Sequence, residues 1–325
     1  MANPTMRDVA DKAGVSLATV SHVINGTRFV SDETAEKVIN AIKELSYVAN
    51  LAARRFKTGK QYMIGFIIPN ISNTYFSTII EEIETVISKK GYSLLLINTK
   101  ESKKKELSAI NTLASGMVDA LIIASTHENY NEISPFLPKD IPVVCVDREL
   151  ENNQSDSVFI SSQYAIIEAT RKLIDSSHKK IGLIAGSTTR IPNMERIKSF
   201  KKAALNFSFP EENMFIEYVD GKQPSIFHAA DELYSKGVTG IIAANNLITL
   251  DLVRWSLNRR LSFKNDIEII GFYTDEILPI SLNASSIHMP TKSLGKLAGE
   301  LVLNRLEDPE GPTVNHILHA NFISR

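Results

Sequence analysis

From residue 62 onward, short apolar runs alternate with amphipathic helical segments, and this alternation restricts the fold more than any other feature of the chain. The first run, residues 63–69 (MIGFIIP), is continuously apolar, as a strand buried on both faces should be. An amphipathic segment at 75–90 follows and stops at Gly91, which favours a helix end there. Strands separated by helices in this way predict a parallel sheet with helices on both faces.

The alternation continues in two sets, separated by a polar stretch at 149–156. Further strands are expected at 92–98, 120–124, 142–146, 180–185, 215–219, 240–244 and 268–272, and further helices at 103–113, 130–137, 165–174, 194–206, 225–235, 247–259 and 292–306. Two successive α/β units predict a bilobed body with a ligand cleft beyond the carboxyl ends of the strands. After the last helix the chain is expected to be extended and to return to the first lobe.

Two short helices are expected before this body. Apolar residues recur at helical spacing in the first of them: Met6, Val9, Ala10 and Ala13. Gly14 then ends the helix, and Ser16 is placed to cap a second one. Two short helices joined by a glycine turn form a helix-turn-helix, whose second helix can enter the DNA major groove. An ordinary helical hairpin has the same spacing, so spacing alone leaves both interpretations open.

The next segments extend this head. Ser31 can cap a third helix that runs to about Leu45 and closes a three-helix core. Residues 47–59 (YVANLAARRFKTG) are both basic and apolar, and Asn50 could cap a short helix within them. Such a helix is too short to be stable alone, so the segment is either an inter-domain linker or a helix that orders on DNA.

The net charge of −1 hides an uneven distribution of charged residues. Residues 1–60 carry nine Lys/Arg and six Asp/Glu, whereas the remaining residues carry 27 and 31. A basic head on an acidic body is expected if only the head meets phosphate groups. Cys145 is the only cysteine, which excludes a disulfide framework. No signal peptide or membrane span is recognised, so a cytoplasmic location is expected.

The motifs of common enzyme classes are missing from the sequence. No G-x-G-x-x-G follows a strand, and neither a phosphate-binding P-loop nor a nucleophile–histidine–carboxylate set is found. Only His316 and His319 have spacing that suits a metal, and they lie in the extended tail. We therefore expect no enzyme, no cofactor and no metal. A solute-binding protein would need a signal peptide and would not need residues 1–59.

Residues 6–26 (MRDVADKAGVSLATVSHVING) closely resemble the lac repressor/purine repressor (LacI/GalR-type) family of bacterial transcription regulators. The resemblance extends over the chain, through ARRFKTG, IGFIIPNISNTYF, PVVCVDR, IAGSTTRIPNMERIKSF, IIAANN, IEIIGF and SSIHMPTKSLG. It implies a helix-turn-helix head at 1–48, a hinge helix at 49–60 and a periplasmic-binding-protein-like body at 61–325. The lobes would comprise 61–160 with 290–320, and 161–289.

The resemblance also implies a homodimer that binds a roughly palindromic operator. A small molecule would control the affinity of this dimer for DNA. The residues facing base edges would be Leu17, Ala18 and His22. The two apolar ones can contact thymine methyl groups but cannot form bidentate hydrogen bonds. The phosphate contacts or helix caps would be Thr5, Ser16, Thr19, Ser21 and Asn25. The minor-groove contacts would be Asn50, Ala53, Arg54 and Phe56, where phenylalanine replaces the family's leucine wedge.

The residues that correspond to the family's effector cleft are Asn73, Tyr75, Phe76, Asp147, Arg148, Arg190, Arg196, Asn246 and Tyr273. Phe76 could instead belong to the core, and Arg148 and Arg190 could be solvated loop charges. Carboxylates usual in the family are replaced at 160–161, 245–246 and 273–274, while the three arginines remain. Because guanidinium groups bind anions, we expect an anionic effector such as a sugar phosphate or sugar acid.

Three alternatives remain open at this point. The cleft could be degenerate, with a protein partner or no ligand controlling the protein. The sequence does not determine whether the effector releases DNA or promotes binding. The absence of a terminal leucine heptad favours a dimer over a tetramer.

Overall fold

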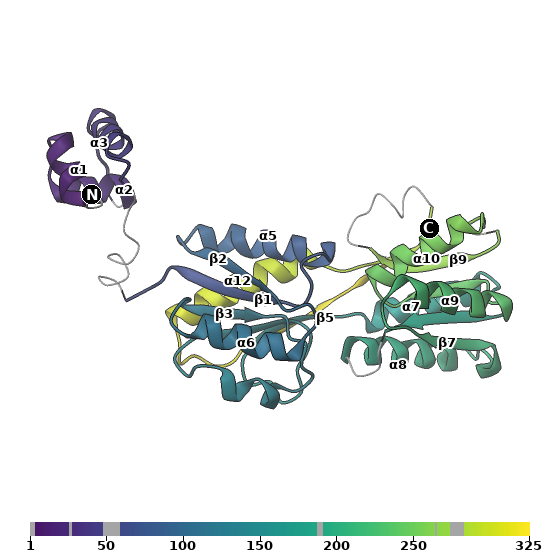
Figure 1. Ribbon diagram of the computed structural model, residues 1–325. Coiled ribbons are helices and arrows are strands. Elements are labelled where there is room, and N and C mark those ends of the chain that lie inside the picture. The colour runs from purple at the N-terminus through teal and green to yellow at the C-terminus, as the bar shows by residue number, and fades with distance from the viewer. Residues whose placement is uncertain (1–3, 26–27, 48–58, 187–190, 264, 274–282) are drawn as a thin grey trace. The chain divides into compact units, whose positions relative to one another are not determined.

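The computed structural model describes residues 4–25, 28–47, 59–186, 191–263, 265–273 and 283–325 (Figure 1). The chain forms two compact units, Met1–Gln61 and Tyr62–Arg325. Each unit has its own hydrophobic core.

The described residues of the N-terminal unit form three helices, α1 (Met6–Ala13), α2 (Leu17–Asn25) and α3 (Asp32–Glu44). Gly14 follows α1 with a φ of 67°, a left-handed conformation that glycine adopts without strain. The helices enclose a small core of Val9, Ala10, Val20, Val38, Ala41 and Tyr47. The expected helix-turn-helix pair and third helix are therefore confirmed.

The first lobe of the larger unit is built on a six-stranded parallel sheet with the order β11-β5-β4-β3-β1-β2. Its strands are β1 (Met63–Ile68), β2 (Ser93–Asn98), β3 (Ala120–Ile123), β4 (Val143–Asp147), β5 (Asp156–Ser161) and β11 (Asn315–His319). The helices α5 (Thr74–Ser88), α6 (Lys103–Ala114) and α12 (Thr291–Glu307) cover the sheet. Because strands and helices alternate, the polar loops gather at the two ends of the sheet.

The second lobe repeats this plan with the order β12-β10-β9-β8-β6-β7. Its strands are β6 (Ile181–Ala185), β7 (Met214–Tyr218), β8 (Gly240–Ala243), β9 (Glu268–Tyr273), β10 (Ser286–His288) and β12 (Asn321–Ile323). Only β12 is antiparallel to its neighbour. The helices are α7 (Gln163–Asp175), α8 (Ile191–Asn206), α9 (Gln223–Ser235) and α10 (Asn246–Asn258), with a short 3₁₀ turn η3 (Glu211–Asn213). The expected bilobed α/β architecture is thus confirmed.

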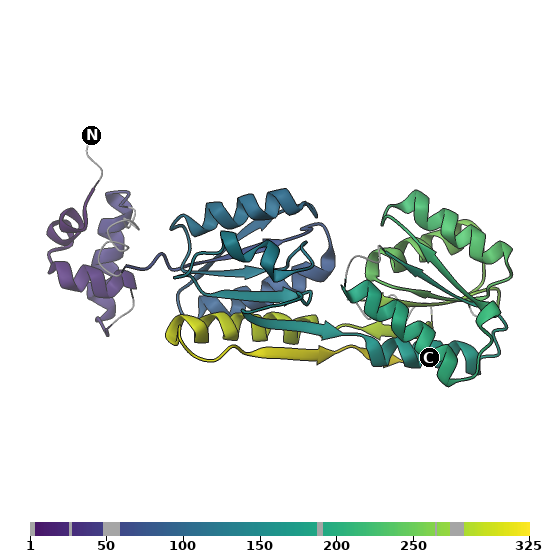
Figure 2. The same ribbon diagram turned by 90° about the horizontal axis from the view of Figure 1, so that it is seen from below.

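Several elements differ from the sequence-based expectations. The helix expected at 130–137 is instead two 3₁₀ turns, η1 (Tyr130–Glu132) and η2 (Ser134–Phe136). Pro135 accounts for the break, because proline lacks the amide proton that a continuous helix needs. The strands β5 and β10 are not anticipated from the pattern. The C-terminal segment returns to the first sheet through β11, as expected, but it then also pairs with the second sheet through β12, which is unexpected (Figure 2).

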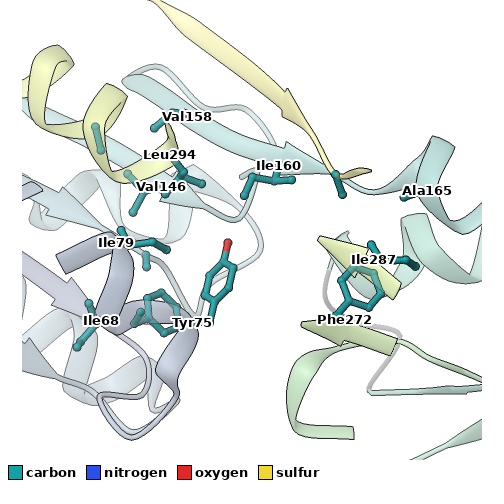
Figure 3. Packing of buried hydrophobic residues seen from close by; sticks show 14 of the residues in the cluster. Ile68, Tyr75, Ile79, Val146, Val158, Ile160, Ala165, Phe272, Ile287 and Leu294 are labelled. Carbon is teal, nitrogen blue, oxygen red and sulfur yellow. The ribbon is translucent and has the colours of Figure 1, made fainter. Parts of the chain in front are cut away.

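The largest hydrophobic cluster includes residues of both lobes (Figure 3). Ile68, Ile79 and Val146 belong to the first lobe, whereas Phe272 and Ile287 belong to the second. The C-terminal helix α12 packs closely on α5, since a Cβ at Gly295 would lie 2.7 Å from the Ile79 carbonyl oxygen. These contacts fix the strand ends from which the polar side chains of the site project.

A methyl group added at Gly271 in β9 is expected to destabilise the second lobe. A Cβ there would lie 2.2 Å from Cγ2 and 2.4 Å from Oγ1 of Thr249. Thr249 cannot rotate away, because its hydroxyl donates to the Asn245 carbonyl at 2.7 Å and accepts from the Phe272 amide at 3.0 Å. We expect Gly271→Ala to lower the free energy of unfolding by about 2–3 kcal/mol, the upper range for overpacking. Denaturant titration measures this change.

Gly182→Ala is the matched control, because its Cβ would meet only side-chain methyl groups, Leu233 Cδ1 at 2.9 Å and Val238 Cγ1 at 3.3 Å. That variant should lose less than about 1 kcal/mol, because a flexible side-chain end can move aside. Equal losses in the two variants would contradict the packing described for Gly271.

Candidate functional site

The outward face of α2 carries the residues predicted to read DNA bases. Leu17 is 49% exposed and Ala18 is also exposed, while Val20 of the same helix is fully buried. His22 and Ser21 are half-buried. The helix therefore presents its N-terminal apolar residues to solvent, as a recognition helix does before it enters a major groove.

Several predicted phosphate contacts serve as helix caps in the structure. Thr5 accepts a hydrogen bond from the Asp8 amide, and Asp8 accepts one from the Thr5 amide, which makes a capping box. Ser16 Oγ accepts from the Thr19 amide at 3.1 Å and lies 2.8 Å from Thr19 Oγ1. The capping role is confirmed for Thr5 and Ser16, and the contact of the five predicted residues with phosphate stays a prediction.

The predicted hinge contacts lie outside the described residues. They are Asn50, Ala53, Arg54 and Phe56. The side chain of Asn25 and the whole of Arg190 also lie outside them.

A cavity of about 410 Å³ lies between the two lobes at the carboxyl ends of their strands. Eight of the nine predicted effector-site residues line it: Asn73, Tyr75, Phe76, Asp147, Arg148, Arg196, Asn246 and Tyr273. Phe76 is only 3% exposed, so it belongs to the hydrophobic core as well as to the wall of the cavity. Further lining residues that the sequence analysis did not name include Glu101 and Phe272. The position of Glu101 just after β2 is the signal that could have identified it.

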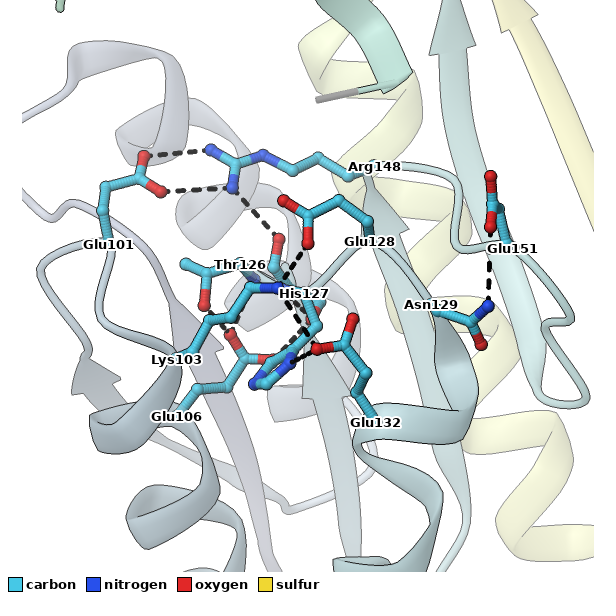
Figure 4. Close-up of polar contacts among 11 residues, drawn as sticks. Glu101, Lys103, Glu106, Thr126, His127, Glu128, Asn129, Glu132, Arg148 and Glu151 are labelled. Carbon is cyan, nitrogen blue, oxygen red and sulfur yellow. Dashed lines mark hydrogen bonds and ion pairs between the residues drawn. The ribbon is translucent and has the colours of Figure 1, made fainter. Parts of the chain in front are cut away.

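Arg148 is not a free cation in this cavity, which corrects the expectation based on three available arginines. Its guanidinium forms two hydrogen bonds to Glu101, at 3.0 and 3.2 Å, and a third to the Ser125 carbonyl at 3.1 Å (Figure 4). Its Nε lies 3.6 Å from an oxygen of Asp147. Although burial acts in the opposite direction, these carboxylates raise the pKa of Arg148. Its charge is therefore already balanced within the first lobe.

Arg196 in α8 is in a different situation. It is 8% exposed, and it donates to Ser162 Oγ at 3.1 Å and to the Ala244 carbonyl at 2.6 Å. Its guanidinium lies 4.4 Å from the centre of the Phe272 ring. Burial lowers its pKa, and no described carboxylate forms an ion pair with it. Buried charges are normally paired, so Arg196 is the cation best placed to take an anionic group.

Three further polar groups face the cavity. Asp147 ends β4 with a φ of 70°, a conformation that is strained for a residue other than glycine, and burial raises its pKa. The hydroxyls of Tyr75 and Tyr273 are buried and have no hydrogen-bond partner among the described residues. Burial raises the pKa of Tyr273 to about 12 and that of Tyr75 well above its ordinary value, so both hydroxyls are neutral. Figure 3 shows the Tyr75 hydroxyl directed into the region between the lobes.

One hydrogen bond joins the lobes across the cavity. Asn246 Nδ2, at the start of α10, donates to Asn73 Oδ1 at 2.7 Å. The same Asn73 oxygen accepts from the Tyr75 amide at 3.1 Å and thereby caps α5. The N-termini of two helices therefore meet at the edge of the site.

Neither a membrane-spanning helix nor a metal site is found in the described part of the chain. None of its helices combines the length and apolarity needed to cross a bilayer. None of its clusters of histidine, cysteine and carboxylate side chains could hold a metal ion.

Comparison with known proteins agrees with this arrangement. Residues 5–50 match the family described as "Bacterial regulatory proteins, lacI family", and residues 61–324 match "Periplasmic binding proteins and sugar binding domain of LacI family". The HTH-type transcriptional repressor PurR of Vibrio vulnificus (strain CMCP6) is 32% identical over 326 residues, which cover 99% of this chain and 97% of that protein. Because this relative is a repressor, the expectation that the chain is not an enzyme is confirmed.

Two solved structures share the fold. The lac repressor dimer bound to operator and the anti-inducer ONPF has a TM-score of 0.79 at 22% identity, with 100% of this chain and 98% of that chain covered. The complex of the transcriptional regulator CelR with cellobiose has a TM-score of 0.70 at 24% identity, with 99% of both chains covered. From its head to its bilobed body, the chain belongs to the lacI family of bacterial regulatory proteins.

Proposed function

We propose that this protein is a repressor of a carbohydrate-metabolism operon whose operator affinity is controlled by an anionic sugar derivative bound between the lobes. The single observation that carries the ligand class is Arg196, a buried cation in the cavity wall with no ion pair to any described carboxylate. An anionic group placed there would gain a charge-assisted, bidentate contact.

The opposite wall of the cavity favours hydroxyl groups. Asp147 and the neighbouring Glu101 make the first-lobe wall acidic, since Arg148 is already shared between them. The hydroxyls of Tyr75 and Tyr273 can each supply one hydrogen bond to a ligand that spans the two lobes. A sugar phosphate or sugar acid has both kinds of group, with an anionic end for the second lobe and hydroxyls for the first.

The effector class is tested by calorimetric titration of the full-length protein with matched pairs of compounds. Glucose 6-phosphate and gluconate are compared with glucose, and corresponding pairs are built on other monosaccharides. We expect the anionic member of at least one pair to bind at least about tenfold more tightly, as one charge-assisted contact gives. Tight binding of a neutral sugar with none of its anionic partner would overturn the ligand class. Binding of neither would favour a protein partner or no effector.

At the other end of the chain, we propose that the head at 1–48 reads operator DNA through Leu17, Ala18 and His22. The segment 49–60 would act as the hinge and the body at 61–325 as the effector-binding and dimerisation domain. A protein that regulates transcription in this way would work in the cytoplasm. Ligand binding would change the angle between the lobes, and through linkage it would change operator affinity.

A homodimer on a pseudo-palindromic operator completes the proposal. Leu250 and Leu257 are 39% and 58% exposed and lie on one face of α10, seven residues apart. Such a face is suited to a second copy of the chain, and one lac repressor structure is described as a dimer. We expect Leu250→Glu with Leu257→Glu to raise the dimer dissociation constant at least about hundredfold, measured by analytical ultracentrifugation.

The control for this pair is Leu205→Glu, since Leu205 is an exposed leucine of α8. This variant should leave the dimer intact. An unchanged dissociation constant in the α10 variant would place the dimer interface elsewhere.

A further inference from the structure

One crossover between the lobes is bound by a carboxylate that the sequence pattern does not single out. Of the three crossovers in the described part of the chain, one runs from β10 to α12 at 289–290, and the other two run from Ser161 into α7 at Gln163 and from β11 to β12 at Ala320. The Ala320 amide donates to the Ser161 carbonyl at 2.9 Å, so these two crossovers are tied together. Any change in the angle between the lobes has to be accommodated at these two crossovers and at the one between β10 and α12.

Glu195 of α8 accepts hydrogen bonds from the crossover between β5 and α7. Its Oε2 accepts from Ser161 Oγ at 2.8 Å, and its Oε1 accepts from the Ser162 amide at 2.7 Å and from Ser162 Oγ at 3.0 Å. Three donors on adjacent residues thus converge on one carboxylate. Because hydrogen bonds to a charged acceptor are stronger than neutral ones, this clamp fastens the crossover to the second lobe.

The clamp also adjoins the cavity. Arg196 follows Glu195 in α8 and donates from Nε to the same Ser162 hydroxyl, at 3.1 Å. Ser162 Oγ therefore contacts both the Arg196 guanidinium, which lines the cavity, and the Glu195 carboxylate, which binds the crossover. A shift of Arg196 toward a bound anion would change the hydrogen bonding of Ser162 without any intervening residue.

We propose that Glu195 is the positioning residue that couples occupation of the cavity to movement of the lobes. Glu195 fixes the position of this crossover relative to the second lobe in the ligand-free protein. A displacement of Arg196 is transmitted to the crossover through Ser162. The link to operator binding rests on the proposed function, whereas control of lobe movement does not.

Lobe movement is tested in full-length, ligand-free protein with spin labels at Ser88→Cys in α5 and Ser235→Cys in α9. Both sites are exposed, whereas Cys145 is buried with its pKa raised to about 12, so it escapes labelling. Labelled subunits are diluted with unlabelled ones so that distances within one subunit dominate. We expect Glu195→Ala to widen the distance distribution at least about twofold. Glu195→Gln retains an acceptor for Ser162 and should stay close to the wild type.

Glu106→Ala is the matched control. Glu106 in α6 accepts hydrogen bonds from the hydroxyls of Ser125 and Thr126 and from the Thr126 amide (Figure 4). Both of these donor residues lie within the first lobe, as Glu106 does. Its loss should lower stability and leave the interlobe distances unchanged. If Glu195→Ala does not fold, Ser162→Ala removes the shared hydroxyl alone and should widen the distribution by a smaller amount.

The second readout is the dissociation constant for operator DNA selected in vitro with the wild-type protein. We expect Glu195→Ala to change it at least about fivefold and Glu106→Ala to leave it within about twofold, at equal concentrations of folded protein. Distances that do not widen, or that widen equally in the Glu106 variant, would overturn the inference. If no operator can be selected, the proposed function fails and the distances alone decide the role of Glu195.

Discussion

Replacing Arg196 with leucine is expected to weaken binding of the anionic effector about hundredfold or more. The loss follows from removing one partner of a buried charge pair, which generally costs several kilocalories per mole. Leucine fits the apolar side of the site, because the guanidinium already stacks on the Phe272 ring. Arg196→Lys keeps the charge but cannot reproduce the separate bonds to Ser162 and Ala244, so it should give an intermediate loss. Calorimetric titration with the anionic compound that binds the wild type measures both.

Arg171→Met serves as the control for this series. Arg171 is an exposed arginine of α7 whose ion pair with Asp175 is 3.4 Å long and open to solvent. Its removal should leave effector affinity unchanged within about twofold, since exposed pairs contribute little. Equal affinity in the Arg196→Leu variant would show that the anion is bound elsewhere.

The largest expected effect on stability comes from Arg305→Met. Arg305 in α12 makes two hydrogen bonds to Asp156, at 2.7 and 2.8 Å, and also donates to the Pro312 carbonyl at 2.8 Å. The side chain of Asp156 is only 2% exposed, so loss of the arginine leaves a buried carboxylate without its cation. We expect the free energy of unfolding to fall by about 3–5 kcal/mol, measured by urea titration.

The local consequence of this change can be checked independently. Asp156 also accepts from the Val314 amide at 2.7 Å, which places the start of β11 beside β5. Relative to the wild type, the variant should therefore accelerate hydrogen exchange at the amides of β11 more than at those of β1. Arg305→Met combined with Asp156→Asn should recover part of the stability, whereas a loss no larger than that of Arg171→Met would contradict the account.

The fold could be predicted largely because its signals are local. Continuous apolar runs such as 63–68 mark strands buried on both faces, and Gly14 marks the turn of the helix pair. The missed elements have weak local signals. β5 begins with the polar Asp156 and Ser157, and β10 has only three residues, so pairing with neighbouring strands decides both.

The site could be predicted less completely, because its energetics depend on pairs that are distant in sequence. The lining residues are predicted through the resemblance to the family. Whether each charged side chain forms an ion pair could not be predicted, since Arg148 is neutralised by Glu101, which is 47 residues away in the sequence. The clamp formed by Glu195 on Ser161 and Ser162 likewise joins separate elements. No periodicity or motif in a single sequence records such a contact.

The central claim is that a small anion in the cavity controls operator binding by the head. It is tested most directly by fluorescence anisotropy of labelled operator, selected in vitro, titrated with full-length protein with and without the anionic compound identified by calorimetry. We expect this compound to change the operator dissociation constant of the wild type at least about tenfold and to leave that of Arg196→Leu unchanged. A wild-type constant that is the same with and without the compound would contradict it.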